Sequence, residues 1–287
     1  MVHPIPVERQ IRRAVCKAPP FTRGTLPGLP EGNSMELQGL RTIAVGGASG
    51  MAKATAERIV AGGGTVAVID RPASDGAEVA SALGGSFHPC DVTDFEGTET
   101  ALSDAIAALD GLDAVVNTAG GGVSARTVSR EGPLPLETFR QVVDLNLIAT
   151  FNVARLAAWQ MSTNEPNDDD ERGVIINTAS IAAFEGQIGQ IAYTASKAGV
   201  AGMCLTMARD LGSFGIRVNA IAPSLFDTGL VKMAPDEMKA KLVADAAFPK
   251  RMGQPDEYAR LAAAIIDNPM LNGGTIRLDA GQRFAPR

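Results

Sequence analysis

Histidine and cysteine are scarce in this chain of 287 residues, and their scarcity excludes several kinds of site. The two histidines are His3 and His88, so a serine–histidine triad or a histidine-rich zinc site would have to recruit one of these imidazoles. The three cysteines are far apart and odd in number, which predicts neither a disulfide framework nor a metal-ligand cluster. Triad and metal chemistry are therefore disfavoured, and a reducing compartment fits best.

The chain also lacks a basic stripe and a long uninterrupted apolar run. Its net charge is −6, with acidic and basic residues interspersed, whereas nucleic-acid-binding surfaces gather lysine and arginine on one face. No run of apolar residues approaches the roughly 20 that span a bilayer. We therefore expect neither nucleic acid nor a membrane as a partner. A soluble protein of the bacterial cytoplasm is expected, or of the mitochondrial matrix if the source is eukaryotic.

The first 34 residues differ from the rest in composition. They contain six prolines and show no sustained periodicity, whereas apolar blocks and turn signals alternate regularly from Met35 onward. We expect residues 1–34 to be a disordered extension or the product of an upstream start codon, and residues 35–287 to form one domain. An organellar transit peptide is the alternative, because the segment holds five basic residues against two acidic ones.

Short apolar runs alternate with helical patterns along the domain. The pattern predicts a Rossmann-type α/β fold with a doubly wound parallel sheet of about seven strands, because strands buried on both faces need helices on both sides. The expected strands lie at 42–45, 65–69, 86–88, 114–117, 174–178, 217–221 and 275–278, and the expected helices at 51–61, 98–109, 136–161, 193–211 and 256–266. The acidic segment 162–172 is expected to be a solvated loop.

A glycine-rich turn lies between the first expected strand and helix. Residues free of side chains let a pyrophosphate approach the backbone amides at the positive end of a helix. Asp70 ends the next strand, where a carboxylate binds the ribose hydroxyls of NAD and repels the 2'-phosphate of NADP. The sequence therefore predicts NAD, although Arg71 beside it would suit NADP. The cofactor candidates of this turn are Gly46, Ser49, Gly50 and Met51.

Polar and small residues follow the next two expected strands. Asp91 and Val92 come after the third, and Asn117, Thr118, Ala119 and Gly120 come at the end of the fourth. Each would be an ordinary turn residue if taken singly. Because open parallel sheets bind ligands at the carboxyl ends of their strands, the repetition indicates a cofactor site.

Tyr193 and Lys197 are four residues apart and so share one face of a helix. A nearby ammonium and the positive charge of oxidised nicotinamide both favour the phenolate, which would take the proton of an alcohol. Ser180 follows the preceding strand and would hold the developing carbonyl oxygen, while Asn146 would complete a proton relay. Each residue also has a purely structural interpretation, and the chemical one depends on their joint order.

This series of motifs resembles the short-chain dehydrogenase/reductase family from about Gly39 to the C-terminus. Val45 and Ala52 depart from the threonine and last glycine of the family's TGxxxGxG turn, and Pro223-Ser224 replaces its PG turn. The resemblance implies that Asn146, Ser180, Tyr193 and Lys197 are the catalytic tetrad. It also implies that the cofactor contacts Tyr193, Lys197, Pro223 and Thr228.

Within the family the chain is most similar to the type 2 3-hydroxyacyl-CoA dehydrogenases. The shared stretches are GVIINTAS, AAFEGQIGQIAY, APSLFDT and NPMLNGGTIRLD. The resemblance implies an acyl-CoA thioester as substrate in fatty-acid metabolism, with Ser180, Gln187 and Tyr193 as substrate contacts, Phe226 over the cofactor and a homotetramer. The alternatives are a hydroxysteroid or other secondary-alcohol dehydrogenase and, from another class, an NAD-binding scaffold or redox sensor.

The segment 225–252 is expected to form a lid that sets substrate choice through its shape. Its cations are candidates for the phosphates of coenzyme A, but acidic residues are interleaved with them, so a mixed solvated surface is favoured. These cations are Lys232, Lys239, Lys241, Lys250 and Arg251.

Overall fold

The computed structural model describes residues 35–229 and 234–286. All seven expected strands are present and form one parallel sheet in the order β3-β2-β1-β4-β7-β8-β9. The expectation for residues 1–34 lies outside the described residues. The strands are β1 Arg41–Val45, β2 Thr65–Asp70, β3 Ser86–Pro89, β4 Ala114–Asn117, β7 Gly173–Thr178, β8 Ile216–Pro223 and β9 Thr275–Leu278.

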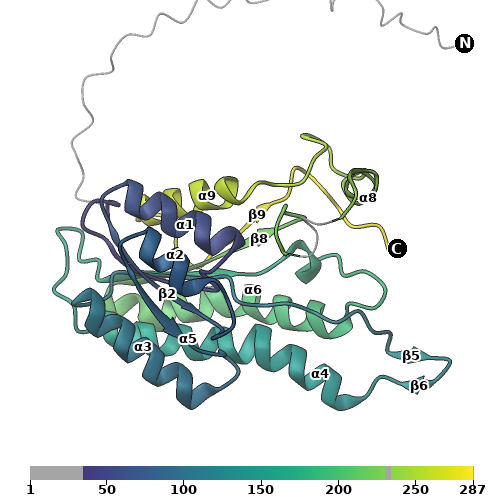
Figure 1. Ribbon diagram of the computed structural model, residues 1–287, viewed down its shortest axis with the longest axis horizontal. Coiled ribbons are helices and arrows are strands. Elements are labelled where there is room, and N and C mark those ends of the chain that lie inside the picture. Colours follow the sequence, from purple (N-terminus) through teal and green to yellow (C-terminus); the bar gives the residue numbers. More distant parts are fainter. Residues whose placement is uncertain (1–34, 230–233, 287) are drawn as a thin grey trace, which may run out of the picture. The chain divides into compact units, whose positions relative to one another are not determined.

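Helices cover both faces of the sheet (Figure 1). On one face lie α1 (Gly50–Ala61) and α9 (Pro255–Asp267), which pack against each other over a core that includes Ile176 and Ile221. On the other lie α3 (Phe95–Leu109), α5 (Ala149–Met161) and α6 (Ile191–Leu211), over a core that includes Ile175 and Val218. Every residue of β4, β7 and β8 is buried, as expected for strands covered on both sides.

The sheet order places a crevice where the cofactor motifs meet. The direction in which successive strands are added to the sheet reverses between β1 and β4, because β2 and β3 lie on one side of β1 and β4, β7, β8 and β9 lie on the other. Val45 and Asn117 are paired neighbours at the carboxyl ends of these two strands. Ligands of open α/β sheets bind at such a switch point.

The expected helix at 136–161 is not a single regular helix. It consists of α4 (Leu136–Val143), one π-helical turn η1 (Asp144–Ile148) and α5. The wide turn surrounds Asn146, which is fully buried and bonded outside the helix as well as within it. Such turns occur often at functional sites. By length and composition the span Leu136–Met161 would suffice to cross a membrane, and half of its most apolar window is buried in the protein.

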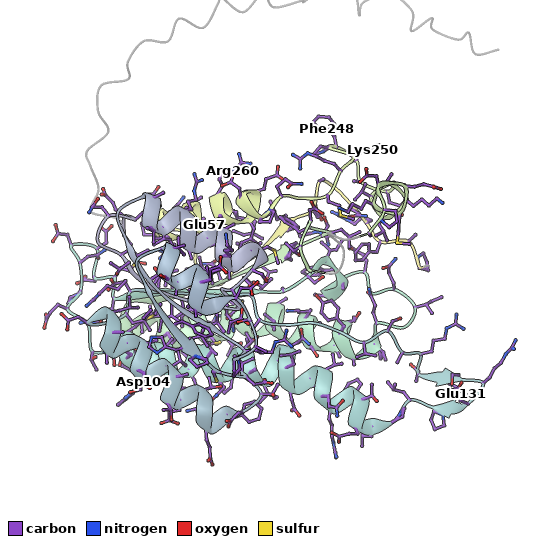
Figure 2. All side chains as sticks on the ribbon, viewed as in Figure 1. Glu57, Asp104, Glu131, Phe248, Lys250 and Arg260 are labelled. Carbon is purple, nitrogen blue, oxygen red and sulfur yellow. The ribbon has the colours of Figure 1, made fainter. Side chains whose placement is uncertain are left out.

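Several short elements of the described residues were not expected from the sequence, among them two helices and a hairpin. The helices are α2 (Gly76–Ala82), which contacts β2 and β3, and α8 (Asp236–Leu242), and the hairpin consists of β5 (Val128–Ser129) and β6 (Gly132–Pro133). Each helix has only seven residues, too few for a clear apolar period. Glu131 lies at the tip of the hairpin, which projects from the sheet (Figure 2).

The acidic segment 162–172 is a loop, but its last acidic residue is not solvated. The Glu171 carboxylate is buried and pairs with Arg217 of β8, also buried. The guanidinium of Arg217 donates as well to the carbonyls of Ile265 and Ile266 at the end of α9. The expectation that the whole segment is solvated is therefore wrong for Glu171, because a buried cation across the sheet requires a counter-ion.

Candidate active site

The glycine turn leaves its backbone open to a ligand. Gly46 and Gly50 have φ of 78° and 57°, a region that residues with a Cβ rarely adopt. A Cβ on Gly46 would lie 2.9 Å from the amide nitrogen of Ala119, so the turn packs directly against the residues that follow β4. Ser49 immediately precedes α1, and Ser49, Gly50 and Met51 at the start of this helix line the cleft at the strand ends, where the free amides of a helix N-terminus favour an anion. The turn thus forms a cradle for an anionic group.

Asp70 joins this turn to the end of β2. Its Oδ2 accepts a hydrogen bond from the amide of Ala48 at 2.9 Å, and its Oδ1 accepts one from the amide of Arg71 at 2.7 Å. A carboxylate has about four acceptor positions, so capacity remains for the hydroxyls of a ribose. The negative charge of Asp70 repels the 2'-phosphate that NADP would place at this position.

A cleft of about 790 Å³ runs along these strand ends. Arg71, which was considered for NADP, lines it beside Asp70. The lining residues that had not been expected, because nothing in the sequence pattern marked them, are Ile69, Cys90, Thr93, Gln141, Asp144, Leu145 and Gly229. The expected residues in its lining are Gly46, Ser49, Gly50, Met51, Asp70, Asp91, Val92, Thr118, Ala119, Gly120 and Thr228. Its size, glycine cradle and carboxylate together fit an extended dinucleotide such as NAD.

Asp91 is held in place within the cleft by its own loop. Its Oδ1 accepts hydrogen bonds from the amide of Thr93 at 3.0 Å and from the Thr93 hydroxyl at 2.7 Å. These two bonds hold the pKa of Asp91 below its ordinary value. The side chain therefore stays ionised and fixed at the rim of the cleft.

Asn146 connects the π-helical turn to the loop after β4. Its Nδ2 donates to the carbonyls of Gly121 at 2.6 Å and Val142 at 2.8 Å, and its Oδ1 accepts from the amide of Gly121 at 3.1 Å. A Cβ on Gly120 would lie 2.7 Å from Asn146 Oδ1 and 3.1 Å from Lys197 Nζ. Glycine at 120 is therefore required for the close approach of these two side chains.

Lys197 is a buried cation anchored to the end of β7. Its Nζ donates to the carbonyl of Thr178 at 2.8 Å, and burial lowers its pKa to about 8. The Thr178 hydroxyl bonds in turn to the Asn117 carbonyl and to the Tyr258 hydroxyl, each at 2.7 Å. Tyr258 of α9 thus supports the site through Thr178. It was missed because a tyrosine within an amphipathic helix has the pattern of a core residue.

Tyr193 faces Ser180, and Lys197 lies beneath its ring. The Lys197 Nζ is 5.7 Å from the centre of the Tyr193 ring. Burial raises the pKa of the Tyr193 phenol, and its hydrogen bond with the Ser180 hydroxyl acts in the opposite direction. Desolvation of the phenolate dominates in the protein alone, so the expected preference for the phenolate depends on the positive charges of Lys197 and of the oxidised nicotinamide ring and stays a prediction. The phenol is held protonated, ready to act as an acid.

A second cavity of about 390 Å³ opens beside the Tyr193 ring. Gln187 lies in its wall, as the resemblance implied. The other lining residues, which had not been expected, are Gly121, Gly122, Val123, Ser124, Ile188 and Gln190. A Cβ on Gly122 would lie 3.1 Å from Tyr193 Cδ2, so this glycine provides the space in front of the phenol. The cavity is therefore suited to the group that reacts at Tyr193.

Asn117, Phe226 and Pro223 were expected to contact the cofactor, but none of the three lines the cleft. Asn117 is buried at the end of β4, where its carbonyl accepts a hydrogen bond from the Thr178 hydroxyl. The side chain of Phe226 is buried in the core and its ring packs where a Cβ on Gly253 would lie, 2.6 Å from the ring, so it does not line the cleft. Pro223 ends β8 inside the sheet and does not line the cleft either. A hydrophobic residue near a ligand motif cannot be assigned to ligand or core from sequence alone.

The described lid cations are engaged by nearby oxygens. Lys239 pairs with Asp227 at 2.9 Å, Lys241 with Glu237 at 2.8 Å, and Arg251 with Glu257 at 2.8 Å, while Lys250 donates to a backbone carbonyl. Lys232 lies outside the described residues. The mixed surface that was favoured from the sequence matches these pairings.

Comparisons with known proteins agree with this geometry. The profile of the family described as short chain dehydrogenase matches residues 41–239. The 3-hydroxyacyl-CoA dehydrogenase type-2 of Bos taurus is 48% identical over 254 residues, which cover 87% of this chain and 97% of the relative.

Several solved structures share the fold. The structure of the 3-hydroxyacyl-CoA dehydrogenase type-2 from Mycobacterium avium is 43% identical, with a TM-score of 0.83 over 87% of this chain and 98% of the other. A 7α-hydroxysteroid dehydrogenase, in complex with NADH and 7-oxo glycochenodeoxycholic acid, is 27% identical, with a TM-score of 0.79 over 89% and 98% of the two chains.

Proposed function

The chain belongs to the short-chain dehydrogenase family, and we propose that it interconverts 3-hydroxyacyl-CoA and 3-oxoacyl-CoA thioesters of short or branched acyl chains. It is an oxidoreductase, and its cofactor is NAD. The observation that carries the proposal is the hydrogen bond of Tyr193 with Ser180 beside a cavity that Tyr193 and Gln187 line, which adjoins the cofactor cleft along the loop after β4.

The four polar residues divide the proton chemistry among them. For reduction, the protonated phenol of Tyr193 gives its proton to the oxygen of the 3-oxo group. Ser180 donates a hydrogen bond to the same oxygen as negative charge develops on it. Lys197 stabilises the phenolate that remains, and Asn146 fixes the loop that separates the two cavities. When bound, NAD supplies or accepts the hydride, and its oxidised ring adds the positive charge that favours phenolate in the oxidation direction.

The thioester class is supported by the relatives. The curated relatives at 46–48% identity are named 3-hydroxyacyl-CoA dehydrogenase type-2, and the residues around Tyr193 are those that carry the resemblance. A hydroxysteroid dehydrogenase is the second candidate, favoured by the fold shared with the 7α-hydroxysteroid enzyme. This hydroxysteroid enzyme has a lower sequence identity to the chain than the 3-hydroxyacyl-CoA dehydrogenases, over a similar share of the chain. A pure NAD-binding scaffold would have no use for the Ser180–Tyr193 pair.

A homotetramer is part of the proposal. Large apolar side chains are exposed on α5 and just beyond α6, and together with residues at the end of α6 they line a hollow of about 250 Å³. Phe151 is 47% exposed, Trp159 76% and Phe214 47%. Exposed aromatic side chains gathered on one face are typical of subunit interfaces. A second copy of the chain would cover this face.

The substrate class is tested by measuring kcat/KM for a panel of candidate substrates in one buffer. We expect acetoacetyl-CoA to be reduced with NADH far more efficiently than free acetoacetate, because the acid lacks the remote binding energy of the CoA group. A 17-hydroxysteroid is tested with NAD in the same buffer, and NADPH is tested beside NADH. A steroid with the higher kcat/KM would replace the thioester as the assigned substrate. No turnover of any alcohol or ketone would support the scaffold.

A further inference from the structure

The last described residues of the chain contact both the loop that leads into α6 and the second half of the lid. Residues 279–286 follow β9, and we name them the C-terminal clasp. The segment starts with a sharp reversal at Ala280 and Gly281, whose φ values are 52° and 71°. Alanine rarely adopts a positive φ, so surrounding contacts must hold this reversal. Figure 1 shows this end of the chain, in yellow, in the same region as α8.

The clasp bonds first to the substrate loop, residues 184–190, which leads into α6. The Nε2 of Gln187 donates to the carbonyl of Ala285 at 3.1 Å, and the amide of Ile188 donates to the carbonyl of Pro286 at 3.1 Å. Gln187 and Ile188 both line the cavity in front of Tyr193. Two backbone carbonyls of the clasp thus hold two residues of the cavity wall.

The clasp bonds also to the second half of the lid. Gln282 is 2% exposed, and its Nε2 donates to the carbonyl of Leu242 at 2.9 Å. The carbonyl of Ala280 accepts from the amides of Ala247 at 3.0 Å and Phe248 at 3.2 Å. Buried polar groups are costly unless they are paired, so these contacts fix the clasp against the lid.

An ion cluster fixes the base of the clasp to the start of the substrate loop. Arg277 donates to both carboxylate oxygens of Glu185 at 2.9 Å each and to Asp279 at 2.7 Å. Arg283 pairs with Asp279 at 2.9 Å from inside the clasp. Bidentate pairs of this kind add directional specificity to their strength. The clasp, the loop and the lid are therefore joined through defined contacts.

We propose that Ala285 is a positioning residue for the substrate, acting through Gln187. A primary amide nitrogen has two hydrogens, and the Ala285 carbonyl takes one of them, which fixes the plane of the Gln187 amide. The second hydrogen remains for an oxygen of the substrate in the cavity. The C-terminus thereby sets substrate affinity without touching the substrate or the cofactor. This inference rests on the proposed role of the cavity in front of Tyr193.

A double-mutant cycle tests the proposal on the full enzyme. The two changes are deletion of residues 285–287 and Gln187→Met, which keeps the length of the side chain but removes its amide. We expect the deletion to raise KM for acetoacetyl-CoA by about tenfold, the scale of a lost directional hydrogen bond, with kcat and NADH affinity unchanged. In the Gln187→Met background the deletion should change KM by less than about twofold, because the two residues act as one unit.

Three results would overturn the proposal. The first is an unchanged KM for acetoacetyl-CoA after deletion of residues 285–287. The second is an equal rise in KM in the wild-type and Gln187→Met backgrounds. The third is a loss of NADH affinity that parallels the rise in KM, as general structural damage would cause. If the wild type turns over a different alcohol instead of the thioester, the proposed function fails, and the same cycle run with that alcohol still decides the role of Ala285.

Hydrogen exchange gives a second and independent readout. The deletion removes the partner of the Ile188 amide, so peptides that cover 184–190 should exchange faster, while α9 keeps its protection. Unchanged exchange in the substrate loop would show that the clasp does not hold it, and would equally overturn the proposal.

Discussion

At the scale of single residues, Asp70 combines two tasks that a sequence motif does not separate. Its carboxylate holds the glycine turn through the Ala48 amide, and we expect its negative charge to lie where the adenosine ribose of NAD binds. Sequence position alone predicted the second task, because an acidic residue about 20 positions after the glycine turn is typical of NAD-binding folds. The first task depends on a contact between two loops and becomes visible only in the structure.

Substituting Asp70 separates these tasks. Asp70→Asn keeps an acceptor for the Ala48 amide but removes the charge, so we expect the preference for NAD over NADP to narrow by at least about tenfold while the fold persists. Asp70→Ala removes both and should also lower the affinity for NAD. Both ratios come from kcat/KM measured with the two cofactors. If the ratio of kcat/KM with NAD to kcat/KM with NADP were unchanged in both variants, Asp70 would not discriminate between the two cofactors.

Lys197 shows how burial sets a titration at the site. The ordinary pKa of 10.5 falls to about 8 because the ammonium is fully enclosed. Between these two values the unfolded chain still binds the proton that the folded protein has released, so folding stability rises with pH across this window. The shift corresponds to a destabilisation of the folded protein on the order of 3 kcal/mol below pH 8, and this cost is lost as the pH rises to 10.5.

We therefore expect the wild type to gain stability relative to Lys197→Met as pH rises from about 8 to about 10.5. The comparison with the variant cancels the titration of all other groups, and urea unfolding at a series of pH values measures it. A difference in free energy of unfolding that stays constant across this range would contradict the cause given for the shift.

At the scale of elements, apolar periodicity was enough to locate the sheet. All seven strands were predicted, because strands buried on both faces are continuous apolar runs between turn signals. The π-helical turn around Asn146 was not predictable, since it depends on hydrogen bonds to Gly121, 25 residues away. The burial of Glu171 was missed for a similar reason, as its partner Arg217 lies on another strand.

The buried pair of Glu171 and Arg217 gives a test at this scale. Glu171→Gln leaves the guanidinium of Arg217 buried without a counter-ion, and we expect the free energy of unfolding to fall by about 3 kcal/mol. Asp169→Asn, an exposed acidic residue in the same loop, is the matched control and should change stability by less than about 0.5 kcal/mol. Chemical denaturation of both variants decides. If Glu171→Gln had the same free energy of unfolding as the control variant, the ion pair would not be needed to fix the loop and α9.

At the scale of the whole molecule, the likeness to a family named site candidates that physical patterns did not, and the structure places these candidates in different surroundings. Gln187 had no pattern of its own, and it was named only through resemblance, yet it lies in the cavity wall beside Tyr193. Phe226 was named in the same way and packs in the core instead. Side-chain identity transfers between relatives, whereas the direction in which a side chain points depends on its local packing.

The proposed assembly is tested on the exposed aromatic residues of α5 and of the turn after α6. Trp159→Arg places a charge in an interface that a second copy would bury, so we expect the tetramer to dissociate into smaller species. Phe248→Arg is the control, because Phe248 is 84% exposed on the segment after α8 and lies outside this face (Figure 2). Light scattering gives the masses. Dissociation by the control alone, or by neither variant, would place the interface elsewhere.

The most direct test of the central claim is the activity of Tyr193→Phe. The variant keeps the ring that lies 5.7 Å from the Lys197 ammonium and loses only the hydroxyl that faces Ser180. With acetoacetyl-CoA and saturating NADH, kcat should fall by at least about 10²-fold, the usual loss when a general acid–base group is removed, while the NADH affinity stays the same. A variant that keeps more than about 10% of wild-type turnover would show that Tyr193 is not the proton donor.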